Sequence, residues 1–423
     1  MRKQLSLVLI LIFTILPLSG VLSINFLQNV EVLNDSKIQS AVEFGNAIDI
    51  SSISIADDYT PSIALDSHGN VHVAFCDSND ILYYTSSVNN FATLAVVASG
   101  GGIPYESPRI LIDSNDVIHI FYEIQVAPER TLWYVNNSIG LFTNHINLTA
   151  RTGVKCLYGN FDVEKGSNDI FHVVSMSNDE VYYFNLKAGT CSSAVLLSTP
   201  DADSDGAPQI AVGQYIMAAW YWSGGVKGTE IMCSTKISGL PWSREINISK
   251  TPGLSKIEMN PGVAIDKIGN FHLFYDNWTG TPHISYCTNK GGVLNYQNLN
   301  FPWKSNTRNE IKTDSNSAIH ALYFHDKTGN NEIYYLTNVN GPFQYYNLSC
   351  NSNNDMSPNL IIDSYNNIHL VYSSNRGGNY DIYYQKITYN EPPNGEIPGW
   401  DWIFLVPTLF FLVFLGKLPR RRF

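Results

Sequence analysis

The sequence is poor in basic residues. It contains 26 Lys and Arg against 37 Asp and Glu, which gives a formal net charge of −11 at pH 7. A chain this acidic repels the phosphates of nucleic acids and anionic lipid head groups. The charge balance therefore argues against nucleic acid as a partner.

Cysteine is also scarce, and no two cysteines have the C-x-x-C spacing of zinc and redox motifs. Such sites are therefore not expected. Outside a reducing compartment the cysteines could be joined in several different pairings, among which the sequence does not choose. The six are Cys76, Cys156, Cys191, Cys233, Cys287 and Cys350.

Helical periodicity is absent from the long region between the two ends of the chain. The 423 residues are 44% hydrophobic and 13% aromatic, with 25 Tyr, which is enough to bury a large core. Aromatic and β-branched residues interrupted by Asn, Ser and Gly turns favour strands. The sequence therefore predicts an all-β protein.

The N-terminal segment reads MRKQLSLVLILIFTILPLSGVLS. Two basic residues precede an apolar run, and small residues follow it, which is the pattern of a secretory signal peptide. We expect a signal peptide over residues 1–23, with an uncleaved anchor as the alternative. A linker over residues 24–45 follows it.

The C-terminal segment combines an apolar run with a basic end. Trp402 to Gly416 is apolar and Arg420 to Arg422 follow it, so we expect a transmembrane helix over residues 400–418 and a cytoplasmic tail over 419–423. The order of IPGW, apolar segment and Arg cluster is similar to the sorting tails of archaeal surface proteins. That resemblance implies cleavage near the motif and replacement by a lipid anchor, although those tails have PGF where this chain has PGW. Both versions predict a cell-surface protein whose domain is extracellular.

One sequence motif recurs along the chain. SPNLIIDSYNNIHLVYSS begins at Ser357, and related segments such as TPSIALDSHGNVHVAF recur about every 49 residues, a period typical of propeller blades. Each copy holds four short apolar runs separated by tight turns, which predicts four-stranded antiparallel blades. The seven copies are anchored at Pro61, Pro108, Gly159, Pro208, Pro261, Asn309 and Pro358.

The repeat predicts a seven-bladed β-propeller over residues 46–389. The last copy ends after its third run, so we expect residues 47–53 to supply its fourth strand and remove an exposed edge. Residues 390–399 are interpreted as a short stalk. The recurring His residues are expected to be core side chains, and the recurring Asp residues are expected to form the turns.

The ends of the third runs resemble a degenerate Asp box, the S-x-D-x-G-x-T-W hairpin of sialidase-like propellers. IYYLTNVNGPF at 333–343 keeps the glycine at Gly341 and the aromatic at Phe343, while Ser or Asn replaces the aspartate in most copies. The resemblance covers the whole repeat region. It implies the propeller fold and no particular activity.

The loops between the second and third runs carry varied polar and aromatic residues. In propellers these loops gather at one end of the channel, and aromatic rings with carboxylates suit the faces and hydroxyls of sugars. Ordinary polar surface is the alternative interpretation. The candidate ligand residues are Asp77, Glu123, Arg130, Trp222, Asp276, Trp278, Asp326 and Arg376.

Two further patterns suggest metal binding and glycosylation. DADSDG places Asp201, Asp203 and Asp205 at a spacing that resembles calcium loops, but the acidic residue expected at the twelfth position is Val212. Ca²⁺ is therefore a candidate cofactor, and a capping role for Asp205 is the alternative. N-x-[ST] sequons begin at Asn34, Asn136, Asn147, Asn247, Asn277 and Asn347.

Three functions compete at this point. The absence of a recognisable catalytic signature favours a non-catalytic surface module that binds a glycan or a protein. A sialidase-like glycoside hydrolase is the second hypothesis, and it requires three arginines to converge beside a carboxylate pair. A structural surface-layer subunit is the third.

Overall fold

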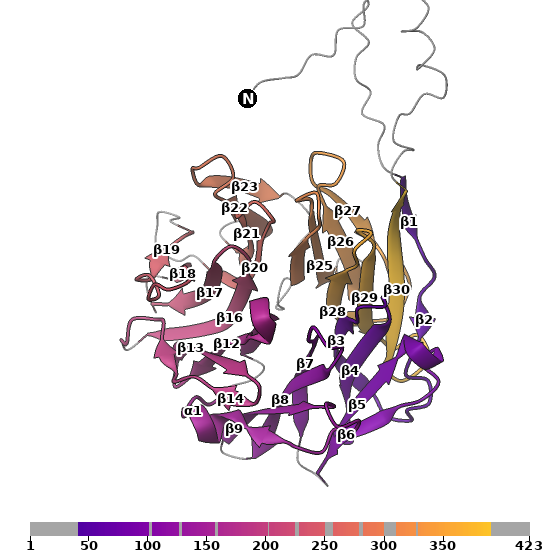
Figure 1. The fold of residues 1–423 in the computed structure, drawn as a ribbon. Coiled ribbons are helices and arrows are strands. Elements are labelled where there is room, and N and C mark those ends of the chain that lie inside the picture. The colour runs from indigo at the N-terminus through magenta and orange to yellow at the C-terminus, as the bar shows by residue number, and fades with distance from the viewer. Residues whose placement is uncertain are drawn as a thin grey trace, which may run out of the picture. The chain divides into compact units, whose positions relative to one another are not determined.

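The fold is that of a β-propeller. The computed structural model describes residues 41–390 except 101–103, 127–128, 157–159, 202, 225–227, 250–256, 279–281, 300–309 and 327–328. These residues form seven antiparallel sheets, each built on four strands that follow chain order from the centre outward, except that the outer strand of the seventh sheet comes from the N-terminal segment (Figure 1). The predicted all-β, seven-bladed architecture is confirmed.

Each blade contributes one innermost strand to the centre of the propeller. The innermost strands are β3 (Asp58–Leu65), β7 (Tyr105–Ile112), β11 (Phe161–Lys165), β16 (Ser204–Val212), β20 (Glu258–Ile265), β24 (Glu310–Thr313) and β28 (Asp355–Ile362). The second strands are β4 (Val71–Asp77), β8 (Ile118–Val126), β12 (Phe171–Ser177), β17 (Ile216–Ser223), β21 (Phe271–Asn277), β25 (Ile319–His325) and β29 (Ile368–Ser374).

The third and fourth strands form the outer half of each blade. The third strands are β5 (Ile81–Ser86), β9 (Glu129–Asn136), β13 (Glu180–Lys187), β18 (Thr229–Lys236), β22 (His283–Thr288), β26 (Glu332–Thr337) and β30 (Asp381–Asn390). The outer strands are β6 (Ala95–Ser99), β10 (Ile146–Asn147), β14 (Thr190–Cys191), β15 (Val195–Leu196), β19 (Ile246–Asn247), β23 (Asn295–Leu299) and β27 (Gln344–Asn347). Short helical turns are η1 (Ser87–Asn89), α1 (Leu148–Thr152) and η2 (Ser167–Asp169).

The strand directions give the propeller two ends. Each innermost strand runs from the end where the second-to-third loops lie, called here the loop end. It runs toward the end where the first-to-second turns and the third-to-fourth hairpins lie, called here the hairpin end. Because the strands alternate in direction, every blade obeys this arrangement.

The N-terminal segment closes the propeller. Strand β1 (Ala41–Phe44) pairs with the end of β30, with Ala41 opposite Asn390, and β2 (Ile48–Asp49) pairs with β30 further along. The seventh blade therefore takes its outer strand from the opposite end of the chain, and the free edge of β30 is covered.

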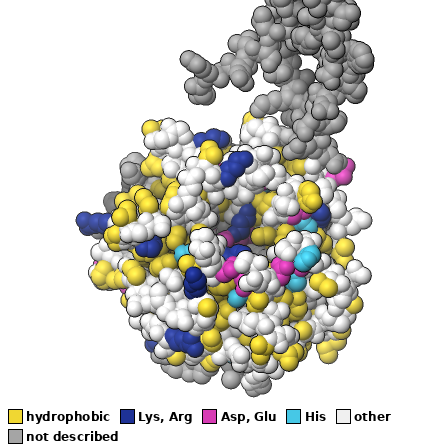
Figure 2. All heavy atoms as spheres, in the orientation of Figure 1, with side chains coloured by type: hydrophobic (Ala, Val, Ile, Leu, Met, Phe, Trp, Pro, Cys, Tyr) yellow, Lys and Arg dark blue, Asp and Glu magenta, His cyan; other side chains and the backbone are white. Residues whose placement is uncertain are grey.

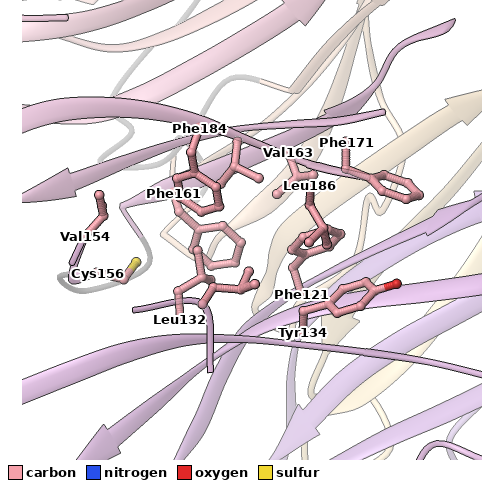
Figure 3. Packing of buried hydrophobic residues seen from close by; sticks show 12 residues of the cluster. Phe121, Leu132, Tyr134, Val154, Cys156, Phe161, Val163, Phe171, Phe184 and Leu186 are labelled. Atoms are coloured by element: carbon pink, nitrogen blue, oxygen red, sulfur yellow. The ribbon is translucent and has the colours of Figure 1, made fainter. Parts of the chain in front are cut away.

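Apolar side chains packed between neighbouring blades form the core. One cluster joins Phe121 and Leu132 of the second blade to Phe161 and Phe184 of the third, and all four are fully buried (Figure 3). Burying a large apolar side chain contributes about 1.5–3 kcal/mol. Similar clusters lie between the other blades.

The recurring Asp residue shapes the turn between the first two strands. Asp66 Oδ1 accepts hydrogen bonds from the backbone N–H groups of His68 at 2.9 Å and Asn70 at 2.8 Å. The same pair of bonds recurs at four other turns, as the sequence predicted. Those turns begin at Asp113, Asp266, Asp314 and Asp363.

The recurring His residue links this turn to the third strand. His72 Nδ1 lies 2.7 Å from the Tyr84 hydroxyl, and its Nε2 lies 3.3 Å from Asp66 Oδ2. A His–Tyr contact of this kind occurs in six blades, which confirms that these histidines are core side chains. The other pairs are His119 with Tyr134, His172 with Tyr183, His272 with Tyr286, His320 with Tyr335 and His369 with Tyr384.

The fourth blade has lost all three members of this arrangement. The strand register places Met217 at the His position and Cys233 at the Tyr position, and both are buried. Gly213 stands where five of the other blades have Asp. An apolar pair therefore replaces a polar one without leaving a buried polar group unpaired.

Candidate functional site

The central channel contains a cavity of about 300 Å³ lined by all seven innermost strands. More of its surface is polar than apolar, and Arg109, Asp162, Glu164, Glu310 and Lys312 are among the residues that line it. Figure 2 shows side chains of both charges near the middle of the visible face, where the blades meet. Charged groups converge here from the second, third and sixth blades.

A backbone bulge precedes the cavity in five blades. The residue before the repeat proline has a left-handed backbone, as at Thr60 (φ 50°) and Ser357 (φ 53°), and the ladder to the second strand shifts register there. Bulges next to active sites commonly re-aim the following side chain. The side chains after the bulges point into the channel from its loop end.

The residues after the bulge form one layer of the channel wall. Three of them bind the backbone of the next blade, because Asn359 Oδ1, Ser62 Oγ and Asp162 Oδ2 each accept an N–H at 3.0–3.1 Å. Such bonds hold the layer rigid. By register the layer consists of Ser62, Arg109, Asp162, Gln209, Gly262, Glu310 and Asn359.

Within this layer Arg109 faces Asp162. The Arg109 Nε atom lies 3.6 Å from Asp162 Oδ1, while the other carboxylate oxygen of Asp162 accepts the Ile210 N–H at 3.0 Å. Both side chains are largely buried, with 15% and 14% of their surface exposed.

Glu164 and Lys312 form an ion pair in the next layer. They keep 27% and 30% of their side-chain surface, which faces the cavity that both residues line. Burial raises the pKa of Glu164; the Lys312 ammonium opposes this shift, and the negative charges of Asp162 and Glu310 reinforce it. Burial acts to lower the pKa of Lys312, but Glu164 and the other acids leave it raised.

The sequence did not reveal this cluster because the third repeat is irregular. Its anchor was placed at Gly159, which lies outside the described residues. The pairing of Glu164 with His172 makes Phe161 the residue equivalent to Pro61. Only with this correction do Asp162 and Glu164 fall at channel positions. The signal available in the sequence was the variation of the residue following each repeat proline.

The candidate ligand residues are spread over six blades near the loop end. Asp77, Glu123, Arg130 and Asp276 are buried. Asp77 closes its own loop by accepting the N–H groups of Asn79 and Ile81, and Arg130 binds Glu106 and Glu123. These residues hold the loops in place. Trp222, Trp278, Asp326 and Arg376 are partly exposed.

Arg376 packs against two tyrosine rings of the seventh blade, those of Tyr372 and Tyr383. Its Nη2 donates to Asp355 at 3.0 Å and to the Tyr372 hydroxyl at 2.9 Å, and its guanidinium lies 4.3 Å from the centre of the Tyr383 ring. Burial alone would lower the pKa of Arg376, but Tyr372 and Asp355 hold it above its ordinary value. No other described arginine shares these partners.

The arginine triad of the sialidase hypothesis does not form among the described residues. Arg109 faces Asp162 and Arg130 binds Glu106, while Arg151 donates to the Gly189 carbonyl and Arg376 donates to Asp355. Each lies on a different element with different partners. Arg308 lies outside the described residues.

The DADSDG segment is occupied by local hydrogen bonds. Asp201 Oδ1 accepts the Asp203 N–H at 2.8 Å, and Asp205 is buried, which raises its pKa to about 7. Within the described ranges, no group of three or more His, Cys, Asp or Glu side chains is arranged to hold a metal ion. The expectation of a calcium site therefore finds no support in this geometry.

The sequon residues have structural contacts of their own. Asn147 caps α1 by accepting the Ala150 N–H at 2.8 Å, and the buried Asn277 donates to Glu258 at 3.2 Å. Asn136 donates to the Tyr134 hydroxyl, and Asn347 accepts the Cys350 N–H. Asn247, the last residue of β19, accepts a hydrogen bond from the Ser249 hydroxyl at 3.2 Å, and Asn34 lies outside the described residues.

The expected signal peptide, stalk, transmembrane helix and basic tail lie outside the described residues, as does nearly all of the N-terminal linker. In the part of the chain that the structure describes, no helix has the length and apolar character needed to span a bilayer.

Comparison with known proteins finds similarity only in structure. No family model and no curated protein matches the sequence. An ulvan lyase of polysaccharide lyase family PL25 superposes with a TM-score of 0.56 at 12% identity, over 78% of this chain and 94% of that one. The polysaccharide lyase Uly1 gives 0.50 at 10% identity, over 79% and 90%. A Dyadobacter fermentans protein of unknown function gives 0.50 at 11% identity, over 82% and 99%.

The comparison corrects one interpretation of the sequence. The absence of a catalytic signature had favoured a non-catalytic binding and adhesion module. Propellers of similar fold include polysaccharide-cleaving enzymes whose sequences are about as different from this chain as unrelated proteins are. A missing sequence signature is therefore no argument against catalysis, and the non-catalytic interpretation is withdrawn.

Proposed function

We propose that this chain is a glycan-cleaving enzyme whose reaction centre is the carboxylate cluster of the central channel. One observation carries the proposal: Asp162, Glu164 and Glu310 line a single cavity together with Arg109 and Lys312. The similar fold of polysaccharide lyases is compatible with this function, but at 10–12% identity it concerns the fold alone.

Asp162 and Glu164 suit the two roles of glycoside hydrolysis. They are two residues apart on β11, so both side chains leave the same face of the strand, toward the channel. Burial raises the pKa of Glu164 against the opposing charge of Lys312, and a raised pKa is what a general acid needs to bind and release a proton. Asp162, held by Arg109 and the Ile210 N–H, would act as the nucleophile or the base.

The glycan would enter from the loop end of the channel. The five bulges lie there, and the layer containing Arg109, Asp162 and Glu310 is the first that a ligand would meet. Rigid bonds to neighbouring blades would hold these groups in position during the reaction.

Elimination at an acidic sugar is a second candidate, because Arg109 and Lys312 place two cations beside the carboxylates. Cations neutralise the carboxylate of a uronic acid and so acidify the neighbouring C–H group. Hydrolysis and elimination both release a reducing end, but only elimination creates an unsaturated sugar that absorbs ultraviolet light.

The test is a panel of neutral and acidic polysaccharides incubated with the full chain. We expect reducing ends to appear with one substrate class, and Glu164→Gln and Asp162→Asn to lower kcat about 10²–10⁴-fold. Glu245→Gln, which changes a carboxylate outside the channel, is the matched control. Cleavage unaffected by both channel variants would refute the assignment of the site. Binding of polysaccharides without cleavage of any member of the panel would refute the proposed catalytic function.

A further inference from the structure

The hairpin end of the propeller carries exposed apolar side chains on separate tips. In the second blade, Ile139 and Leu141 have exposed fractions of 68% and 66% at the hairpin between β9 and β10. In the fourth blade, Ile237 and Leu240 have 57% and 55%. The other exposed apolar residues at this end are Val88, Ile268, Val293, Leu294 and Tyr365.

The two ends of the propeller differ in how many exposed apolar side chains they carry. At the loop end, the described residues with large exposed apolar side chains are Ile53, Ile55 and Ile257. They lie in two connections between blades, whereas the hairpin end has such residues on turns of five blades. Singly exposed apolar residues are common on protein surfaces, so it is their concentration at one end of the propeller that calls for an explanation.

Both described ends of the chain leave the propeller at this same end. Ala41 pairs with Asn390 at the end of β30, and Figure 1 shows β1 and β30 side by side where the chain departs. In the sequence, the apolar segment 402–416 follows Asn390 by only twelve residues. Twelve residues reach at most about 40 Å, so that segment is tethered to the hairpin end.

We propose that the hairpin end rests on a lipid bilayer, with the tips of the second and fourth blades inserted among the head groups. A protein partner, including a second copy, needs a continuous surface of about 800 Å². The tips instead present single apolar residues separated by polar turns, which a bilayer interface accepts one at a time. The acidic charge of the chain makes a zwitterionic surface the better partner.

This placement goes beyond the proposed catalytic function and does not depend on it. It sets the loop end of the channel facing away from the bilayer. A glycan would then reach the channel from the side opposite the lipid.

The test is flotation of residues 40–391 with phosphatidylcholine vesicles. This segment contains all seven blades, the closing strands and every described core cluster, so it folds as a unit. We expect it to float with the vesicles, and the double variant Leu141→Asp, Leu240→Asp to lower the bound fraction at least about ten-fold.

The matched control is Ile53→Asp, Ile55→Asp, which adds the same charge at the loop end and is expected to leave flotation unchanged. Unfolding midpoints establish that both variants fold. Failure of the unaltered segment to float would overturn the proposal, as would equal loss in both variants. Sedimentation that shows tip-dependent dimers without flotation would assign the surface to a second copy and also overturn it.

Discussion

The Nδ1 atom of His119 lies 2.7 Å from the hydroxyl of Tyr134, and both side chains are buried in the second blade. On the other side of the ring, His119 Nε2 lies 3.2 Å from Asp113 Oδ2. The contact joins the turn between the first two strands to the third strand. It therefore couples three of the four strands of the blade.

Removing the hydroxyl of Tyr134 should destabilise the protein. Tyr134→Phe leaves the buried His119 without its Nδ1 partner, which costs about 1–3 kcal/mol. Denaturant unfolding measures the change, with the exposed Tyr365→Phe as control. A loss no greater than that of the control would show that the contact contributes nothing to stability.

Acid should destabilise the propeller through these histidines. Burial lowers the pKa of His72, His119, His272 and His369, and that of His172 to about 4. The unfolded histidines bind protons near pH 6.5 and the folded ones only at lower pH. The contribution of these histidines to the free energy of unfolding is therefore complete above about pH 6.5 and is lost as the pH falls toward 4.

The contribution of the histidines to the pH dependence of stability can be separated from that of other groups by substitution. His172→Phe should reduce the loss of unfolding free energy between pH 7 and pH 4, whereas the exposed His68→Phe should not. Unfolding curves at several pH values measure both slopes. Identical slopes in the two variants would contradict the assignment.

Asp58 should have the opposite pH dependence. Burial raises the pKa of this fully buried carboxyl to about 7, so its stabilising protonated form is lost as the pH rises from about 4 through 7. Asp58→Asn retains an acceptor for the Ser54 hydroxyl, now 3.0 Å from Asp58 Oδ1, and carries no charge. We expect it to stabilise the protein at pH 8 by on the order of 2–4 kcal/mol and to have little effect at pH 4.

The matched control for this prediction is Asp179→Asn, at an exposed aspartate. Melting temperatures at pH 4 and pH 8 give the comparison. A stabilisation that did not depend on pH would point to packing and not to charge.

Substitutions of Met217 and Cys233 in the fourth blade should have non-additive effects on stability. Met217→His alone buries an unpaired ring nitrogen, and Cys233→Tyr alone inserts a ring without its partner, so each should cost more than about 1 kcal/mol. The double variant recreates the pair seen in six other blades. We expect its destabilisation to be smaller than the sum of the two single effects, as a double-mutant cycle of unfolding free energies would measure. Strict additivity would contradict the equivalence of the blades.

The seven-bladed architecture could be predicted from the sequence because the residues that define each blade lie close together in the chain. The Asp of the turn and the His of the second strand lie six residues apart, as in Asp66 and His72, so their spacing is visible in the chain. The apolar runs around them then fix strand number and order. That the N-terminal segment closes the last blade was foreseeable, because the last copy lacks a fourth run, but the predicted range 47–53 contains only the two-residue strand β2, and the longer closing strand is Ala41–Phe44.

The channel cluster was harder to predict for a physical reason. Glu164 and Lys312 are 148 residues apart and meet only because the ring closes. In the third repeat, Phe161 replaces the proline and Gly166 replaces the turn Asp, so of the Pro, Asp and His that mark the register elsewhere only His172 remains. Nor does the sequence show that Glu123 and Asp276 are buried rather than displayed at the loop end.

The pairing of β1 with β30 also determines how the propeller bears mechanical load. Because Ala41 lies opposite Asn390, force applied to the two tails acts at the same end of an antiparallel pair. The hydrogen bonds then break one after another, as in a zipper, instead of sharing the load in shear. Tension between the tails would peel β1 away first and open the ring at the seventh blade, while the other six blades remain intact.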